Sequence, residues 1–419
     1  MKQIPSSNFR PPADEINDAE PRFGGKNASR GLKYAVCADG KTCEITGIGT
    51  CMDDTVVIPA VLDGYTVTGI ARNAFRYCRR FTEVVIPDSV LTVGERAFAE
   101  CKPLLRVTLG GAVESIGVAA FGNCTSLISL ALPASVRSIG ERAFSGVGRI
   151  LVSPDNPNYS SVEGTLYSKD GGTLLHYAGD EGETSFCVPG SVCRIGAMAF
   201  YRCTSLTEVH IPGSVTDIDE YAFCGCTGLS RVAIPDSVQR IGEGAFAGVG
   251  EVYFTASNPC YTSVGGAVYT KDGKTLLHFA ANGNEKEFTV PETVTAIGNG
   301  ACYFCDSLVS AVIPNSVTRI GENAFWSCKN LTEISLGDSV TTIGRYAFKA
   351  CGSLRRVTLP ASLTFIGEKA FLFCPSLSAV CYRGTRMQWK KVRLEEFKWR
   401  YESAIRALEC ADGTIEYLF

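Results

Sequence analysis

A 23-residue repeat constrains this chain more than any other feature of its sequence. The repeat is marked by alanine-phenylalanine pairs, and their phenylalanines are Phe75, Phe98, Phe121, Phe144, Phe200, Phe223, Phe246, Phe325, Phe348 and Phe371. Cys302 takes the Phe position in one further copy, and two gaps of 56 residues each hold one repeat plus 33 inserted residues. A unit this small cannot bury its own apolar face, so a fixed period of this length predicts copies stacked into a solenoid.

The unit that starts at Ile320 indicates the local structure. Its fixed apolar positions are Ile320, Ala324, Phe325, Cys328, Leu331, Ile334, Leu336 and Val340. Apolar residues alternate at Ile334 and Leu336, which is the period of a β-strand. In many copies proline follows this strand, and proline ends strand pairing because it has no amide donor. The Gly after the opening Ile suits a tight turn. We therefore predict a strand-rich solenoid with short helical or 3-10 turns.

Composition excludes some function classes. The formal net charge of the 419 residues is -3, whereas a surface that tracks phosphates is clearly basic, so we predict no nucleic-acid partner. The chain has no run of about 18 apolar residues, so no transmembrane segment is predicted. The first ten residues lack the apolar core of a secretory signal peptide.

The consensus Ile-Gly-x-x-Ala-Phe-x-x-Cys-x-x-Leu-x-x-Val-x-Ile-Pro-x-Ser-Val resembles the BspA-like leucine-rich repeat family over about residues 32–383. The resemblance implies a leucine-rich-repeat solenoid with capped ends. The expected divisions are a disordered leader at 1–30, an N-terminal β cap at 31–66, the solenoid at 67–382 with hairpin inserts near 150–190 and 251–292, and a C-terminal cap at 383–419. Residues 386–408 are expected to form a basic amphipathic helix that covers the last coil or, alternatively, binds a membrane surface or a partner.

Members of that family are largely surface or secreted proteins that bind host proteins or other cells. The resemblance therefore implies a non-catalytic scaffold for protein–protein interaction or adhesion, whose partner is a protein such as a host or cell-surface protein. The alternative is an intracellular interaction scaffold without an adhesive role. The location is the cell surface or outside by resemblance, and the cytoplasm if Met1 is the true start. The oligomeric state stays open.

Nine of the 19 cysteines recur three residues after the Phe position. They are Cys78, Cys101, Cys124, Cys203, Cys226, Cys305, Cys328, Cys351 and Cys374. A periodic ladder of this kind favours small buried hydrophobic residues over disulfides or metal ligands. Cys302 and Cys305 form a CxxC pair, but no second pair supplies the other ligands of a structural zinc. We predict no metal and no cofactor; Cys43 and Cys51, outside the ladder, could pair in an oxidising compartment.

The histidines give no catalytic signal. His176 and His278 are copies of one another in the two inserts, and His210 lies on a predicted strand. A catalytic triad needs a nucleophile, a histidine and a carboxylate that converge. Repetition instead favours packing or surface roles for these side chains, so no catalytic residue is predicted.

The two inserts share a pattern, because residues 156–176 parallel residues 258–278. Asp-Gly pairs between apolar runs predict hairpins. Insertions often gather on one face and form a binding surface, and a structural role is equally compatible with the pattern. The candidate insert residues are Tyr159, Tyr167, Asp170, His176, Tyr261, Tyr269, Asp272 and His278.

The predicted strands carry a second candidate surface. Glu and Arg alternate between neighbouring copies at 83/106, 208/231 and 333/356, and such cross-strand pairs stabilise a sheet by roughly 0.2–1 kcal/mol each. The alternative is that this face is the concave recognition surface. The candidate binding residues are Glu83, Arg106, Thr108, Glu208, His210, Arg231, Glu333, Ser335, Arg356 and Thr358.

Overall fold

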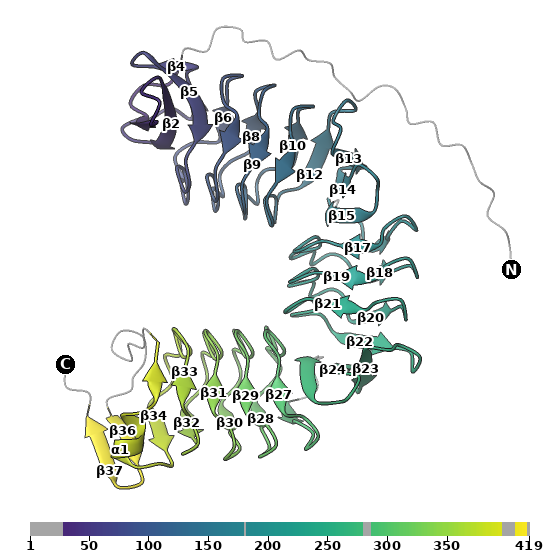
Figure 1. The fold of residues 1–419 in the computed structure, drawn as a ribbon, viewed down its shortest axis with the longest axis vertical. Helices are drawn as coiled ribbons and strands as arrows, with labels where there is room; N and C mark the ends of the chain where they lie inside the picture. Colours follow the sequence, from purple (N-terminus) through teal and green to yellow (C-terminus); the bar gives the residue numbers. More distant parts are fainter. Residues whose placement is uncertain (1–27, 180–181, 280–285, 396–406, 417–419) are drawn as a thin grey trace, which may run out of the picture.

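The computed structural model describes residues 28–179, 182–279, 286–395 and 407–416. These residues form the predicted strand-rich solenoid, and Figure 1 shows its coils arranged as an open arc. The arc consists of three straight stacks, because the strands nearer its hollow form three separate sheets. We call these the inner strands, and the strands on the far side of each coil the outer strands. Most of the predicted leader lies outside the described residues.

The first stack begins with an antiparallel pair and continues with parallel strands. The pair is β1 (Lys33–Val36) and β2 (Thr42–Gly47), and β4 (Val61–Leu62) pairs with β5. The inner strands are β5 (Tyr65–Ile70), β7 (Thr92–Val93), β9 (Ser115–Ile116) and β11 (Ser138–Ile139). The outer strands are β3 (Thr55–Val57), β6 (Glu83–Val85), β8 (Arg106–Thr108), β10 (Ser129–Leu132) and β12 (Arg149–Val152).

The second stack follows the first insert, which forms the antiparallel strands β13 (Tyr159–Val162), β14 (Thr165–Ser168) and β15 (Thr173–His176). Its inner strands are β17 (Arg194–Ile195), β19 (Asp217–Ile218) and β21 (Arg240–Ile241). Its outer strands are β16 (Ser185–Cys187), β18 (Glu208–His210), β20 (Arg231–Ile234) and β22 (Glu251–Phe254).

The third stack follows the second insert, which forms β23 (Tyr261–Val264), β24 (Ala267–Thr270) and β25 (Thr275–His278). Its inner strands are β27 (Ala296–Ile297), β29 (Arg319–Ile320), β31 (Thr342–Ile343), β33 (Phe365–Ile366) and β35 (Arg393–Leu394). Its outer strands are β26 (Glu287–Thr289), β28 (Ser310–Val312), β30 (Glu333–Ser335), β32 (Arg356–Leu359), β34 (Ala379–Tyr382), β36 (Ala407–Cys410) and, paired antiparallel at the end, β37 (Gly413–Glu416).

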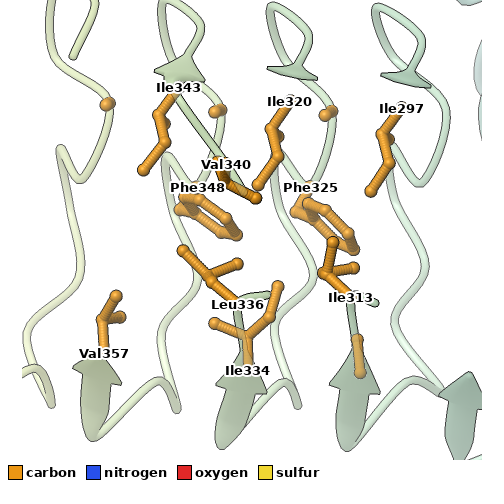
Figure 2. Close-up of a cluster of buried hydrophobic side chains, with 14 of the residues drawn as sticks. Ile297, Ile313, Ile320, Phe325, Ile334, Leu336, Val340, Ile343, Phe348 and Val357 are labelled. Atoms are coloured by element: carbon orange, nitrogen blue, oxygen red, sulfur yellow. The ribbon is translucent and has the colours of Figure 1, made fainter. Parts of the chain in front are cut away.

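Copies of the same residue stack on one another and form the core. Phe325 and Phe348 lie 5.3 Å apart between ring centroids with only 7° between their planes, and both side chains are fully buried. Figure 2 shows these two rings between the isoleucines of the inner strands and the Ile334–Leu336 segment of the outer strand. The in-register pairing of Ile320 with Ile343 fixes this arrangement. The core is thus continuous within each stack because each repeat position contacts its own copies.

The cysteine ladder is buried, as predicted, and it also satisfies backbone groups. The Cys351 thiol donates a hydrogen bond to the carbonyl oxygen of Phe325, 26 residues earlier, at 3.1 Å. Six other ladder thiols make the equivalent bond, and they belong to Cys101, Cys124, Cys226, Cys305, Cys328 and Cys374. Cys78 and Cys203 are only half-buried. All 19 cysteines are free thiols, including Cys43 and Cys51.

The glycine of the recurring Ile-Gly pair has a different structural role from the one predicted. Gly344 does not adopt a positive φ; instead, a Cβ atom at this position would lie 2.6 Å from the backbone nitrogen of Glu322 in the preceding coil. The glycine is therefore needed for close approach between coils. The turn itself is made by left-handed residues that are mostly not glycine, such as Tyr346 (φ 56°) and Ala350 (φ 59°).

The predicted helix at 386–408 is wrong over the residues that the structure describes. Only α1 (Arg386–Trp389) is helical, with Thr385 as its N-cap. After this turn the chain rejoins the inner sheet, where Leu394 pairs with Ile366, and β36 continues the outer sheet. Repeat-type strand pairing thus replaces the helix that the amphipathic pattern favours, and a β-hairpin lies at this end. Residues 396–406 lie outside the described part of the chain.

Candidate functional site

The candidate residues of the strand face lie on the outer strands with their side chains toward solvent. None of the ten is buried. Where two of them lie on one strand, the residue between them belongs to the core, as Val209 and Ile334 do. In Figure 1 the outer strands lie farther from the hollow of the arc than the inner strands do. The expectation that this face is concave is therefore wrong. The turns that carry the Ala-Phe pairs line the inner side instead.

Ion pairs on this face follow the predicted pattern only in part. Arg106 lies 3.7 Å from Glu83 on the neighbouring strand. Arg231, in contrast, pairs with Glu251 at 3.4 Å, because β18 and β20 belong to separate sheets. Arg356 lies beside Glu333 in register but forms its ion pair with Glu409 at 3.7 Å. All three arginines are mostly exposed, so these pairs contribute less than about 1 kcal/mol each.

Most of the candidate insert residues are part of the core. Tyr167, His176, Tyr269 and His278 are all buried. Tyr261 is also buried, and its hydroxyl accepts a hydrogen bond from the backbone nitrogen of Ile241 at 2.9 Å. Tyr159 is half-buried and makes the corresponding bond in the first insert. Of the eight, only Asp170 and Asp272 are exposed, at the hairpin turns. The alternation of each insert therefore reflects packing, and the inserts offer little free surface through these side chains.

Each insert joins two stacks and continues their aromatic column. Leu174 of β15 pairs with Ile195 of β17, so the third strand of the insert takes the place of an inner strand. Two residues further on, the His176 ring contacts the ring of Phe144 edge-on, with 6.4 Å between centroids. The Tyr177 ring packs at a tilt against the ring of Phe200, with 5.0 Å between centroids. His278 contacts Phe246 in the same way at 6.1 Å. The two histidines are thus structural connectors between columns.

The three stacks meet on the inner side at Tyr221. The Arg142 guanidinium of the first stack lies 5.4 Å from the Tyr221 ring centroid. The Tyr221 hydroxyl donates to Glu243 at 2.9 Å and accepts from the Asn323 amide of the third stack at 3.3 Å. Burial and the Glu243 carboxylate raise the pKa of the Tyr221 hydroxyl. This side chain was not among the predicted site residues, because it occupies a variable position of the repeat.

The two corners between stacks differ in packing. At the second corner, between the second and third stacks, Ala247, Cys224 and Tyr303 form a small buried cluster. A Cβ on Gly300 would lie only 3.0 Å from the Cα of Gly244. The equivalent residues of the first corner, 102 positions earlier, are Met198 and Arg142, and both line a cavity of about 290 Å³. The first corner is therefore the more open one.

We expect the two buried histidines to make stability depend on pH. The Nε2 atom of His176 donates to the carbonyl oxygen of Gly148 at 2.8 Å, and that of His278 to Gly250 at 3.0 Å. Burial lowers the pKa of both imidazoles from their ordinary 6.5. Below about pH 6.5 these histidines bind protons in the unfolded chain but stay neutral in the folded chain. The free energy of unfolding therefore decreases as the pH is lowered, by up to about 1.4 kcal/mol per pH unit for each histidine.

Urea unfolding between pH 7.5 and 5 measures this dependence. Replacing both residues, as in His176→Gln with His278→Gln, should flatten the curve while a side-chain N–H donor is retained. The His210→Gln variant, at an exposed strand position, controls for the loss of an imidazole. A double variant that keeps the full slope would contradict this account of the inserts.

The described residues contain no helix that is both long and apolar enough to cross a membrane. Over the same residues, no group of three or more His, Cys, Asp or Glu side chains is placed to hold a metal ion. Burial raises the pKa of the Cys124 thiol to about 12, so this ladder thiol is not an activated nucleophile.

Comparison with solved structures gives several similar folds. A leucine-rich cell surface protein from Faecalibacterium prausnitzii A2-165 is 25% identical, with 89% of this chain and 99% of that chain covered and a TM-score of 0.48. The pneumococcal vaccine antigen PcpA is 18% identical over 94% and 90%, with a TM-score of 0.49. A leucine-rich repeat protein from Eubacterium ventriosum is 23% identical over 84% and 95%, with a TM-score of 0.46.

A search of curated proteins gave no match. The family model described as BspA type leucine rich repeat region matches in six copies, over residues 63–159, 179–268 and 278–390. These ranges cover most of the chain and include all the Phe positions of the repeat. The matched ranges form the coils with the buried cysteine ladder and the parallel inner strands. The chain belongs to the BspA-type leucine-rich repeat family.

Proposed function

We propose that this chain is a non-catalytic scaffold that binds another protein through its outer strands. The observation that carries the proposal is the exposure of the alternate residues on these strands. Glu208, His210 and Arg231 point to solvent from two neighbouring coils of the second stack, and Glu333 and Ser335 do so in the third. Side chains at regular spacing on a rigid stack give a partner fixed contact points at little entropic cost.

Residue chemistry supports binding over catalysis. Two of the three histidines are buried connectors, and the third, His210, is exposed on β18 between the buried Val209 and Ile211. A nucleophile, a base and an orienting carboxylate would have to converge in a partly enclosed pocket. The family membership also supports binding, because a leucine-rich-repeat scaffold presents side chains on a repetitive surface. Adhesion at a cell surface and interaction inside a cell are the two settings in which such a scaffold would act.

Site-specific photocrosslinking in cells of the natural source would test the proposal. A photoreactive amino acid would replace His210 or Ser335 on the outer strands and, as the matched control, the exposed hairpin residue Asp272. We expect one polypeptide adduct at both strand positions and none at the hairpin. The same adduct at all three positions, adducts only at Asp272, or no adduct at either strand position would each contradict the proposal. The identity of the adduct would separate an adhesive role from an intracellular one.

A further inference from the structure

One edge of the first stack combines exposed apolar and basic residues. It consists of residues 78–82, 101–105, 124–128 and 147–149, which link each Ala-Phe turn to the next outer strand, and residues 202–206 across the first corner. We call this surface the basic edge. It contains Arg79, Arg80, Lys102, Arg149 and Arg202 and no acidic residue.

Two apolar residues of the basic edge are exposed to solvent, while the others belong to the core. Leu105 is 57% exposed and Ile128 is 74% exposed. The two lie at the same repeat position in adjacent coils, so they form a short apolar track. Adjacent coils are joined there by backbone hydrogen bonds, from Leu105 to Thr82 at 2.7 Å and from Arg149 to Ile128 at 2.7 Å. Exposed aliphatic side chains that recur side by side are typical of a contact surface.

The track leads to a cavity at the first corner. This cavity has a volume of about 710 Å³, and its lining includes Ile128, Tyr201, Arg202, Thr204 and Ser205. None of the described residues that line it is acidic. The nearby carboxylate of Glu100 accepts a hydrogen bond from the Asn123 amide at 2.9 Å. A cavity of this size with hydroxyls, an aromatic ring and a guanidinium suits a few residues of a peptide.

The second corner provides an internal comparison. There, Phe304 replaces Arg202, Asp306 replaces Thr204, and Ser230 replaces Ile128. Phe304 packs toward Gly248 of the preceding stack and joins the buried cluster at that corner. The aliphatic part of Arg202 instead lies over Gly225 of the next coil, so its guanidinium stays exposed beside Tyr201, 5.6 Å from that ring. The apolar track and the basic charge thus belong to the first corner.

We propose that the basic edge binds an acidic peptide segment of a partner protein. Apolar side chains of the segment cover Leu105 and Ile128, and one of its carboxylates pairs with Arg202 in the cavity. A guanidinium binds a carboxylate through paired hydrogen bonds, while exposed aliphatic residues favour a peptide over a nucleic acid. The inference rests on the proposed role as a protein-binding scaffold but concerns a surface separate from the outer strands.

Fluorescence anisotropy with labelled peptides would test the inference. The probe alternates glutamate and leucine, and the comparison peptides carry lysine in place of glutamate or serine in place of leucine. We expect binding of the first peptide only, and weaker binding at higher salt because exposed charges are screened. Binding of the lysine peptide, equal binding of a single-stranded oligonucleotide, or no binding of the probe would overturn the inference.

Variants locate the site without disturbing the core. Ile128→Ser and Arg202→Phe each introduce the residue found at the second corner, and each should weaken probe binding by about tenfold or more. Arg355→Ser, an exposed change at the same repeat position as Ile128 in the third stack, should leave binding unchanged. Probe binding that is lost in His210→Ala but kept in Ile128→Ser would refute the basic edge and leave the strand-face proposal standing.

Discussion

Replacing Phe348 with alanine is expected to lower the free energy of unfolding by about 4 kcal/mol, because a fully buried aromatic ring leaves a cavity that its neighbours cannot fill. The ring stacks on Phe325 at 5.3 Å and on Phe371 at 5.2 Å, so the substitution removes contacts on both sides. Urea unfolding followed by circular dichroism gives the change from the shift in midpoint.

Phe373 provides the matched control, since this side chain belongs to the next coil and is 57% exposed. Phe373→Ala should change the free energy of unfolding by less than about 1 kcal/mol. Equal losses in the two variants would mean that the aromatic column does not carry the stability of the stack. Repeat arrays can unfold in parts, so hydrogen exchange at the third stack should be measured alongside.

The second large effect is expected at the glycine of the Ile-Gly step. Gly344→Ala should destabilise the third stack by about 3 kcal/mol, because the added methyl group meets backbone atoms that cannot rotate away. The nearest of these are the nitrogen of Glu322 and the carbonyl carbon of Gly321, both 2.6 Å away. The coils would have to separate, and the inner pairing of Ile320 with Ile343 would weaken. Urea unfolding again measures the loss.

Gly352 tests the same change where space is available. The nearest atom to a Cβ at Gly352 is 4.0 Å away, and its φ is not positive, so Gly352→Ala should be neutral or stabilise the chain by up to about 1 kcal/mol. Two coils carry a side chain at the repeat position of Gly344, namely Ala71 in the first stack and Asp219 in the second. Asp219 lies beside the cavity of about 290 Å³ at the first corner. A mild effect of Gly344→Ala would mean that the coils separate at low cost.

Much of the fold can be predicted from the sequence because each repeat position has one environment. The spacing of Phe325 and Phe348 predicts their stacking, and the alternation at Ile334 and Leu336 predicts the outer strand. The periodic cysteines are predicted to be buried for the same reason, and the structure confirms this for seven of the nine ladder residues.

Long-range relations were harder to predict. The helix expected at 386–408 conflicts with strand pairing to the preceding coil, which is a non-local interaction. Arg231 and Arg356 pair with Glu251 and Glu409 because sheet boundaries and the terminal hairpin bring those carboxylates closer. Tyr221, which joins all three stacks, could not be recognised before the inserts were known to form corners. Comparing residues 102 positions apart would have singled out Arg202 and its counterpart Phe304.

The cysteine ladder has a consequence for how this molecule can be observed. Because a ladder thiol is buried and bonded to the coil before it, as Cys328 is to the carbonyl of Cys302, an alkylating reagent can reach it only after those coils separate. The rate of labelling at each of the seven buried ladder positions therefore reports how often the coils around it open. Mass spectrometry can compare these labelling rates along the chain. The comparison would show whether the solenoid opens first at its ends or at a corner.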